Sequence, residues 1–434
     1  MINKHLRIAP HNVWKLLLIC YIAYVATFFG RTNYSSAMVA IIPDLGCTKA
    51  EAGLVNSFFW GIYGIGQIVN GLFADRINNK VMITLSLSVS AVINLSMPFV
   101  ADIHIMKYLW LLNGIAQSVM LTNLMGTITH MAPIDMIPRV TAVFHTSAAA
   151  GTLLSYLTSS LFLKIASWKF LFYAASALLL VTAIVWFLVI SNLQKHRIHT
   201  DDTETEPAPQ TNFLSSLKQI KYIFIAGGLV FSLVIAFFDA VHREGLTVWL
   251  PNFAKETYFT SDSISVLIAI VLPIVNLFGS WLVSFTGKRL GKYSNSVVIA
   301  TTLYIAAFFV LIALRLTAFH SLVAACILIA SITLMMTAIN ACVVNHIAIE
   351  VAAYGCSAAL TGIINFGYCS GSSLSSYLIG FIQEKWGWVT VFDFFWVVAI
   401  IAVVCGIACS FFWTRFLRRL KISQEQNNTV SHTA

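Results

Sequence analysis

The sequence predicts an all-α membrane protein with twelve transmembrane helices in two pseudo-symmetric bundles of six helices. Of the 434 residues, 59% are hydrophobic and only 10% are charged, whereas an average soluble domain has about 25% charged residues. Because so few polar side chains cannot cover a globule of this size in water, most of the surface must face lipid. A transmembrane helix with its connection takes about 30 to 40 residues, so the chain is long enough for twelve.

Each apolar run is expected to form one helix, since about 20 apolar residues cross the hydrocarbon layer. The first run follows a basic start. It is too long for a signal peptide and lacks a small-residue cleavage site, so we expect it to stay in the mature protein. The predicted helices are 14–42, 52–74, 81–101, 105–131, 140–166, 168–192, 222–257, 260–286, 293–315, 319–347, 352–382 and 388–414.

The lysines and arginines near the helix ends predict the orientation in the membrane. With a cytoplasmic N-terminus, seventeen of them lie in inner segments, seven lie in outer loops, and Arg31 and Arg243 lie inside helices. This asymmetry predicts a multi-pass protein of the cell (inner) membrane with both termini cytoplasmic. The net charge of +9 then reflects topology, and no basic stripe with interleaved aromatic residues indicates nucleic-acid binding.

One long polar segment divides the chain into two halves of six helices. It contains an acidic run and two prolines, and it cannot bury a core, so we interpret it as a surface linker. The eight cysteines form no CxxC pair, so neither a disulfide framework nor a metal site is expected. The predicted domains are an N-terminal six-helix bundle at 1–193, a cytoplasmic linker at 194–221, a C-terminal six-helix bundle at 222–414 and a cytoplasmic tail at 415–434.

The two halves carry matching residues at a nearly constant spacing. A single offset of 212 residues maps Arg31 to Arg243, Arg76 to Lys288 and Lys80 to Lys292. At an offset of 220 residues, Trp168 and Phe172 recur as Trp388 and Phe392. These matches predict two similar half-bundles related by an axis along the membrane normal, with any substrate site at their interface near the midplane.

Arg31 is the strongest candidate for a binding residue. It lies 16 residues after Lys15 and 12 before Pro43, roughly 24 Å and 18 Å from the two ends of its helix. Burying an arginine there costs about 2.5 to 3.5 kcal/mol, so the side chain should face a water-filled cavity or an anion. The alternative is a structural arginine paired with a neighbouring helix.

Arg243 is a weaker candidate when it is considered alone. Asp239 lies four residues before it and Glu244 directly after it, and an Asp–Arg pair at that spacing is a sufficient structural explanation. The repeat relation to Arg31 favours a role in the site. Two guanidinium groups suit a ligand with planar oxygens and about two negative charges, such as a phosphate monoester.

Two converging arginines without a ligand would repel each other in a low dielectric. We therefore expect a carrier that reorients readily only when loaded, which is an exchanger. Neighbouring polar side chains could bind the same ligand, although such residues more often hold helices together. These further substrate-binding candidates are Tyr24, Tyr63, Gln67, Asn365 and Tyr368.

A short inner loop joins the second and third predicted helices, with Gly71, Asp75, Arg76 and Lys80 in it. Three of these residues could stabilise one conformation of a carrier, by accepting a hydrogen bond from a neighbouring helix end or by forming an ion pair with it. They are Asp75, Arg76 and Lys80. The alternative interpretation is ordinary positive-inside charge. The loop resembles the major facilitator superfamily, whose second loop has the pattern G-x-x-x-D-[RK]-x-x-x-[RK], and the twelve-helix count agrees with that family.

Within that superfamily the chain resembles the organophosphate:phosphate antiporters. The similar segments are FGRTNYSSAM around Arg31, YGIGQ before the short loop, HREGLTVWLPNF around Arg243, LTGIINFGYCSG in the eleventh predicted helix and the WGW that follows it. The resemblance implies that the two arginines bind phosphate, that tyrosines at the positions of Tyr24, Tyr63 and Tyr368 line the site, and that transport proceeds by alternating access.

Three positions depart from that family. Gln67 and Thr32 stand where its members usually have lysines, and Ala148 stands where the glycerol-phosphate carrier has a histidine. The site has lost cations relative to that family, so a ligand less charged than a sugar phosphate, or one that is not a phosphate ester, stays an alternative.

Three functions remain open from the sequence. The first is exchange of an organophosphate for inorganic phosphate, by a monomer. The second is a proton-coupled carrier of an organic anion such as a carboxylate, with Asp239 or His242 as the proton site. The third is a sugar-phosphate receptor that does not transport. An enzyme is not expected, because no catalytic constellation converges on one face, and no cofactor is implied.

Overall fold

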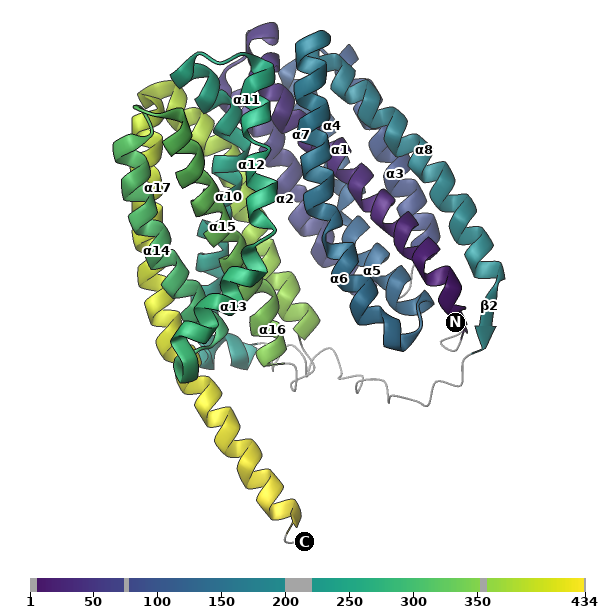
Figure 1. The fold of residues 1–434 in the computed structure, drawn as a ribbon, viewed down its shortest axis with the longest axis vertical. Helices are drawn as coiled ribbons and strands as arrows, with labels where there is room; N and C mark the ends of the chain where they lie inside the picture. Colours follow the sequence, from purple (N-terminus) through teal and green to yellow (C-terminus); the bar gives the residue numbers. More distant parts are fainter. Residues whose placement is uncertain (1–5, 74–77, 200–220, 352–356, 433–434) are drawn as a thin grey trace. The chain divides into compact units, whose positions relative to one another are not determined.

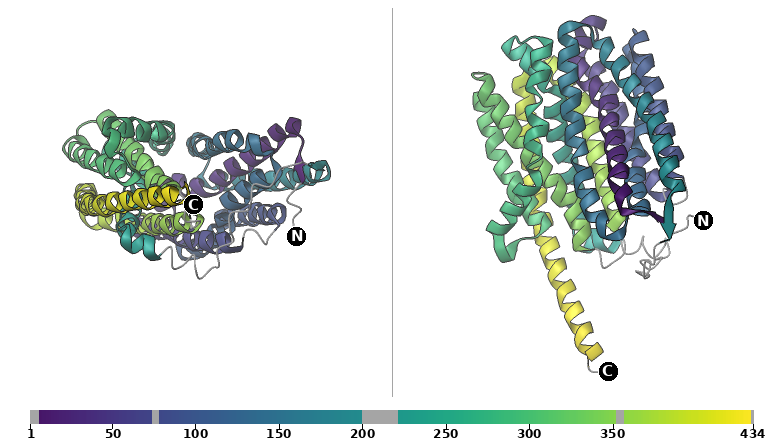
Figure 2. Two further views of the ribbon diagram at one scale, coloured as in Figure 1. Left: turned by 90° about the horizontal axis from the view of Figure 1, so that it is seen from below. Right: turned by 45° about the vertical axis from the view of Figure 1, so that its right-hand side comes forward.

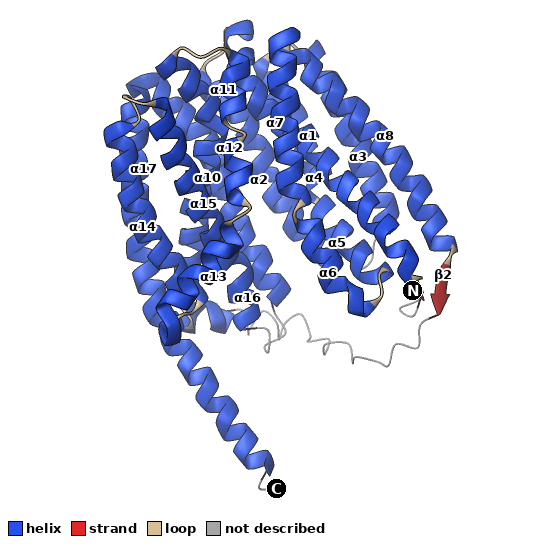
Figure 3. Ribbon diagram, viewed as in Figure 1, coloured by secondary structure: helices blue, strands red, loops and turns tan. Residues whose placement is uncertain are grey.

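The computed structural model describes residues 6–73, 78–199, 221–351 and 357–432. These residues form helices almost throughout, in agreement with the predicted all-α class (Figure 3). The helices of the first half are α1 (Val13–Leu45), α2 (Lys49–Phe73), α3 (Asn79–Ser96), α4 (Ile103–Ser118), α5 (Met120–Met131), α6 (Ile137–His145), α7 (Ser147–Ile165) and α8 (Trp168–Lys195) (Figure 1).

The second half is also helical from residue 221 onward. Residues 221–226 are helical, and a π-helical stretch at Ala341–His346 joins α15 to α16. The remaining helices are α10 (Leu229–Tyr258), α11 (Asp262–Ile268), α12 (Val271–Asn276), α13 (Gly279–Leu290), α14 (Ser296–Thr317), α15 (Leu322–Asn340), α16 (Ile347–Glu350) and α17 (Ser357–His432).

Several predicted helices are interrupted in ways that the hydropathy pattern does not reveal. The predicted helix 105–131 is broken at Val119, 140–166 at Thr146, and 260–286 is divided into three pieces. The predicted helix 222–257 is interrupted at Gly227 and Gly228, where Gly228 has a φ of 68°. Breaks of one or two residues leave the apolar run intact, so only the backbone geometry shows them.

The last two predicted helices are joined in α17, which bends where Gly387 adopts a φ of 78° and a ψ of 177°. The prediction that the final helix ends at 414 is wrong, since α17 continues to His432. No proline or glycine follows Gly406. The sequence therefore loses its apolar character after residue 414 without any residue that would stop a helix.

Seven helices of the described residues are long and apolar enough to cross a membrane, or eight if the bent pair Asp262–Asn276 and Gly279–Leu290 is counted as one span. This number is below twelve because α17 contains two predicted spans, the predicted helix 105–131 is divided, and α2 and α10 include polar residues. Each of the twelve predicted helices has a helical counterpart among the described residues. The chain is a multi-pass membrane protein.

The chain divides into two compact units. Unit 1 consists of Met1–Thr205, Glu244–Leu277 and Ser372–Val391, and unit 2 of Glu206–Arg243, Phe278–Gly371 and Phe392–Ala434. Unit 1 therefore takes in the last part of α10, all of α11 and α12, and the middle of α17. The domain boundaries derived from the sequence rest on the repeat pattern and stay a prediction.

A pair of equivalent hydrogen bonds in unit 1 supports the predicted repeat. The indole Nε1 of Trp168 donates to Asp44 Oδ2 over 2.8 Å, and that of Trp388 donates to Glu256 Oε2 over 3.0 Å. Asp44 and Glu256 are themselves 212 residues apart. The same tryptophan-to-carboxylate bond thus joins corresponding helix ends in both halves of the chain.

A short sheet was not predicted from the sequence. Strand β1 (Leu6–Ile8) pairs antiparallel with β2 (Arg197–His199), with Arg7 opposite Ile198. Each strand has three residues, which is too short for an alternation of polar and apolar residues to be recognised. The pair joins the segment before α1 to the segment after α8 within unit 1.

Candidate functional site

Arg31 lies in an aromatic cage within unit 1. Its side chain belongs to the uninterrupted helix α1 and is 9% exposed. The guanidinium carbon is 3.7 Å from the centre of the Phe28 ring and about 6 Å from those of Tyr24 and Tyr63, and Nη1 donates to the Tyr63 hydroxyl over 3.5 Å. In the described parts of the chain no carboxylate forms an ion pair with Arg31, and the carboxylates of Glu51, Glu256, Asp262 and Asp393 pair with other side chains.

Buried amides fix the position of α1 at the residue before Arg31. The carbonyl oxygen of Gly30 accepts from Asn113 Nδ2 over 2.7 Å and from Asn94 Nδ2 over 3.2 Å. A β-carbon at Gly30 would come within 2.7 Å of Leu179 Cδ1 and within about 3.2 Å of polar atoms of Gln117 and Ser90, so these side chains would have to move aside. These contacts hold α1 against α3 and α4 and thereby position Arg31.

The same amide cluster explains two polar residues beside Arg31. Asn33 Nδ2 donates to Asn94 Oδ1 over 2.8 Å, and the Tyr34 hydroxyl donates to the carbonyl oxygen of Ala52 over 2.9 Å. Both side chains therefore connect helices. Asn94 and Asn113 were not predicted as site residues, since their only signal in the sequence is an amide inside an apolar run.

Replacing Asn113 by leucine is expected to destabilise the protein by about 1 kcal/mol. The change removes the 2.7 Å bond to Gly30 and leaves Ser90, which donates to Asn113 Oδ1, without that acceptor. Interhelical hydrogen bonds in membranes are worth about 0.6 to 2 kcal/mol. Thermal unfolding in detergent measures the effect, with Asn192→Leu as the control because that amide is exposed. Equal stability of the two variants would contradict a positioning role for Asn113.

Arg243 belongs to unit 2 and has a tyrosine neighbour of its own. Its side chain is partly buried, and its guanidinium carbon is 5.9 Å from the centre of the Tyr368 ring. Tyr368 is buried, while Asn365, one turn earlier on α17, is partly buried. Each of the two arginines therefore lies beside a tyrosine in its own unit. Gln67, in unit 1, is partly buried on α2.

The two residues considered as proton sites are both completely buried in unit 2. Asp239 and His242 have no exposed surface. The ring nitrogens of His242 lie 2.8 Å from the carbonyl oxygen of Phe238 and 3.0 Å from that of Phe395, and the hydroxyl of Tyr304 is 3.2 Å from Nδ1. His242 thus links α10 to α14 and α17, which is a structural use of the ring.

The residues predicted to act in gating are only partly covered by the structure. Asp75 and Arg76 lie outside the described residues. Lys80, in the first turn of α3, extends to α8, where Nζ is 3.3 Å from Ser191 Oγ and 4.5 Å from the centre of the Phe187 ring. The gating role of all three stays a prediction.

Two of the three positions that depart from the resembled family, Thr32 and Ala148, make contacts with neighbouring helices. The hydroxyl of Thr32 bonds to the carbonyl oxygen of Phe28 over 2.7 Å and to Ser155 Oγ of α7 over 2.6 Å. Ala148 packs against the hydrophobic core around α1. Neither side chain could replace the cation that the family has at that position.

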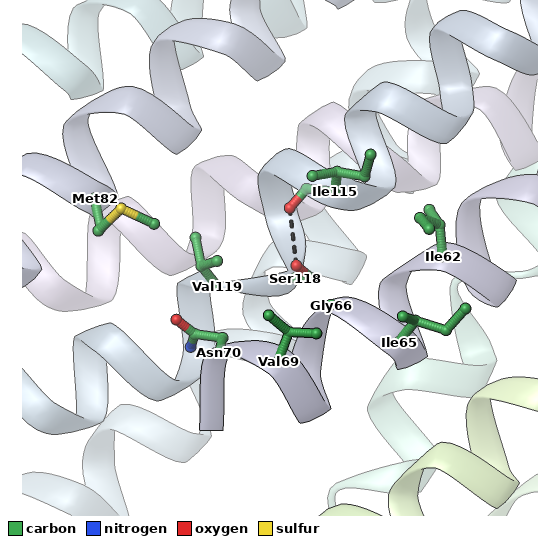
Figure 4. Close-up of a pocket in the computed structure, with 9 residues that line it drawn as sticks. All are labelled: Ile62, Ile65, Gly66, Val69, Asn70, Met82, Ile115, Ser118 and Val119. Atoms are coloured by element: carbon green, nitrogen blue, oxygen red, sulfur yellow. Dashed lines mark hydrogen bonds between the residues drawn. The ribbon is translucent and has the colours of Figure 1, made fainter. Parts of the chain in front are cut away.

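An apolar cavity of about 360 Å³ lies between α2, α3 and α4, away from the predicted site residues. Figure 4 shows its lining, in which Asn70 and Ser118 are the polar side chains. None of the predicted binding residues lines it. A lining this apolar offers an anion few hydrogen-bond donors, so this cavity is not a candidate for the substrate site.

Small residues bring helices of unit 1 into close contact at one end. Ser57 of α2 and Ser373 of α17 each donate to the other's carbonyl oxygen, and Ser160 and Ser263 do the same between α7 and α11. A β-carbon at Gly53 would overlap the carbonyl oxygen of Ser376. These helices therefore meet backbone to backbone.

A charged cluster lies at the same end of unit 1, around Glu256. This carboxylate pairs with Lys49 Nζ over 2.8 Å and accepts from Gln383 Nε2 over 2.7 Å, in addition to its bond from Trp388. Three segments far apart in the sequence, α2, α10 and α17, are joined by one side chain.

Comparison with known proteins agrees with this arrangement. The family model described as Major Facilitator Superfamily matches residues 20–376. The chain is 24% identical over 287 residues to a probable chloroplastic anion transporter 4 of Oryza sativa subsp. japonica, covering 62% of this chain and 47% of the relative. It is 21% identical over 301 residues to a probable hexose phosphate transport protein of Chlamydia pneumoniae, covering 65% of this chain and 66% of the relative. The matched region thus spans about half to two-thirds of these relatives.

A solved structure shows the same fold over nearly the whole chain. The inward-facing, unoccupied form of a bacterial homologue of the human lysosomal transporter Spinster superposes with a TM-score of 0.72 at 17% identity, covering 94% of this chain and 98% of the other. At that identity the likeness concerns the fold alone. The fold, the family model and the transporter relatives together show that the chain belongs to the Major Facilitator Superfamily and is a membrane transporter rather than an enzyme.

Proposed function

We propose that the protein is a secondary active transporter that exchanges a small organophosphate for inorganic phosphate by alternating access. The observation that carries this proposal is the environment of Arg31. A buried guanidinium surrounded by Phe28, Tyr24 and Tyr63 keeps a full positive charge in a low dielectric. An anionic ligand would supply the opposite charge, and a phosphate oxygen pair matches the guanidinium geometry.

Arg243 and Tyr368 are proposed to bind the same ligand from the second half of the chain. The support is the repeat offset that relates Arg243 to Arg31 and the shared pairing of an arginine with tyrosine. Relatives named as anion and hexose phosphate transporters favour an anionic, phosphorylated substrate. The proposed auxiliary contacts are Gln67 and Asn365, which are both partly buried amides.

The contacts at the Glu256 end are proposed to be the ones that break during alternating access. They are the Lys49–Glu256 ion pair and the serine hydrogen bonds between α2 and α17 and between α7 and α11, which water can replace at modest cost. The predicted orientation places this end outside the cell, with both termini in the cytoplasm and the protein acting as a monomer in the inner membrane.

Reconstituted transport tests this function directly. Proteoliposomes loaded with inorganic phosphate and challenged with a panel of phosphate esters and carboxylates are expected to exchange phosphate for an ester, with little efflux into anion-free medium. Efflux as fast as exchange would refute exchange. Uptake of a carboxylate driven by a proton gradient would instead support Asp239 or His242 as a proton site, and binding without transport would indicate a receptor.

A further inference from the structure

We propose that a basic cavity at the shared end of α1 and α8 binds the phosphate group of an anionic membrane phospholipid. The cavity has a volume of about 460 Å³ and lies within unit 1. The segment that leads into α1 contributes one wall, and the last two turns of α8 contribute the other. The lining residues are His11, Asn12, Lys15, Val189, Asn192, Leu193 and His196.

The side chains of this cavity suit a phosphate group. Lys15 brings an ammonium group, and His11 and His196 bring imidazoles, all on exposed side chains. Nδ1 of His196 is bonded to the carbonyl oxygen of Asn192 over 2.9 Å, so its Nε2 is the ring nitrogen that can bind a ligand. The lining contains no carboxylate. Three cationic or potentially cationic donors thus surround a space large enough for a headgroup.

Among the described residues, no carboxylate forms an ion pair with these cations. Ion pairs of the described residues join Lys49 to Glu256, His104 to Glu51, Lys255 to Asp262 and Arg315 to Asp393. None of them involves a residue of the cavity, and neither Lys15 nor the adjacent Lys195 forms an ion pair within the described part of the chain. An external anion can supply the opposite charge at this cavity.

The surfaces that lead to the cavity indicate that this anion is a lipid. On α1, Trp14 and Leu18 are about 60% exposed, and on α8 Leu188 and Val185 form a similar exposed stripe that continues, one turn later, to Asn192. Exposed apolar side chains of a membrane protein contact acyl chains, and an exposed tryptophan marks the headgroup level. The polar cavity lies where both apolar stripes end. This position corresponds to the depth in the membrane at which a phospholipid carries its phosphate group.

The strand pair keeps the two walls of the cavity together. Strand β1 precedes His11 and strand β2 follows His196 directly, and the two are paired in register. Arg7 in β1 donates through Nη1 to the carbonyl oxygen of Thr129 at the end of α5, over 3.0 Å. Figure 2 shows α1 and α8 side by side, with the strands at their shared end. A binding site held in place before the ligand arrives loses less entropy on binding.

Native mass spectrometry of the full-length protein in mild detergent tests this inference without measuring transport. The probes are phosphatidylglycerol and phosphatidylcholine, which share acyl chains and differ in net charge. We expect one phosphatidylglycerol to be retained in preference to phosphatidylcholine. Because one cation near an anionic lipid contributes about a fivefold gain in binding, Lys15→Gln should weaken phosphatidylglycerol binding about fivefold.

Lys195→Gln is the matched control, since Lys195 is an exposed cation beside His196 that does not line the cavity. It should leave phosphatidylglycerol binding unchanged within about twofold. Equal losses in the two variants, or equal retention of both lipids, would overturn the proposal in favour of a general surface charge effect. Displacement of the lipid by millimolar inorganic phosphate would overturn it in favour of a soluble anion, since phosphate lacks the acyl chains that lie along α1 and α8.

Discussion

Arg31→Met is expected to abolish exchange and to make the folded protein more stable. The methionine keeps a long side chain against the Phe28 ring but removes a buried charge that no described carboxylate neutralises. Holding an arginine at the centre of a transmembrane helix costs about 2.5 to 3.5 kcal/mol, of which a desolvated cation–π contact recovers about 2 kcal/mol. The net expectation is a gain of about 1 kcal/mol in the free energy of unfolding.

The opposite signs of the two effects separate the roles considered for Arg31. If Arg31 were a structural residue, the variant protein would lose both stability and activity. If Arg31 binds the substrate, the variant protein loses only activity. Inorganic phosphate should then stabilise the native protein but not the variant. Phosphate exchange in proteoliposomes and thermal unfolding with and without phosphate give the two readouts.

Arg315→Met is the control for this experiment. Arg315 pairs with Asp393 through Nε over 2.8 Å, and its side chain is 29% exposed, so its loss should cost at most about 1 kcal/mol and leave exchange near the native rate. Arg31→Met with native exchange, or with a large loss of stability, would show that Arg31 is a structural residue.

Gly53→Ala is expected to hold the Glu256 end of unit 1 open and to slow exchange by about 5- to 150-fold. The added methyl group would overlap the carbonyl oxygen of Ser376, and neither backbone can yield without separating α2 from α17. Overpacking of this kind costs about 1 to 3 kcal/mol, which shifts a two-state equilibrium by that factor. An alternating-access carrier needs both states, so its turnover falls.

Gly61→Ala on the same helix is the matched control. A β-carbon there would meet the hydroxyl of Ser373 at 3.2 Å and its Cβ at 3.9 Å; the hydroxyl can rotate aside at the cost of one hydrogen bond to Ser57, and no backbone atom has to move. This variant should exchange at close to the native rate. Equal exchange by Gly53→Ala and the native protein would show that the contact between α2 and α17 does not open during transport.

Alkylation of Cys47 can detect the opening of the Glu256 end without a transport measurement. Cys47 lies between α1 and α2, where burial and the charges of Glu51 and Glu384 raise the pKa of its thiol to about 11. Opening would remove the burial and the contribution of Glu384, so the pKa should fall and alkylation at pH 8 should accelerate about tenfold in Gly53→Ala. Peptide mass spectrometry measures the alkylation of Cys47 over time. An alkylation rate equal to that of the native protein would contradict the proposed opening.

The sequence was sufficient to predict the fold class and the candidate arginines, for a physical reason that is local. A charge in a long apolar run is costly wherever the helix packs, so sorting the cations by position isolated Arg31 and Arg243 without any knowledge of neighbours. The repeat of tryptophans at 168 and 388 was visible in the same way, and the structure adds that both donate to corresponding carboxylates.

The partners of polar side chains could not be predicted. Asn33 and Gln67 look alike in the sequence, yet Asn33 bonds to Asn94 of α3, 61 residues away. Helical periodicity indicates the face on which a residue lies but not which helix covers that face. The interruptions at Val119 and Thr146 were missed for a related reason, because a local change of ψ, to −12° and −16° respectively, leaves no trace in hydropathy.

The sequence by itself thus determined that this protein crosses the membrane in repeated helical halves. It also placed two arginines deep in the membrane, where burial of a charge is unfavourable unless a ligand or a partner side chain compensates it. Only the tertiary structure decided which of the two, a ligand or a partner side chain, the surroundings of Arg31 favour. It surrounds the guanidinium with aromatic rings, and no described carboxylate pairs with it. It also decided where helices meet through glycine and serine. Close backbone approach depends on small residues from segments hundreds of positions apart, and no single segment encodes it.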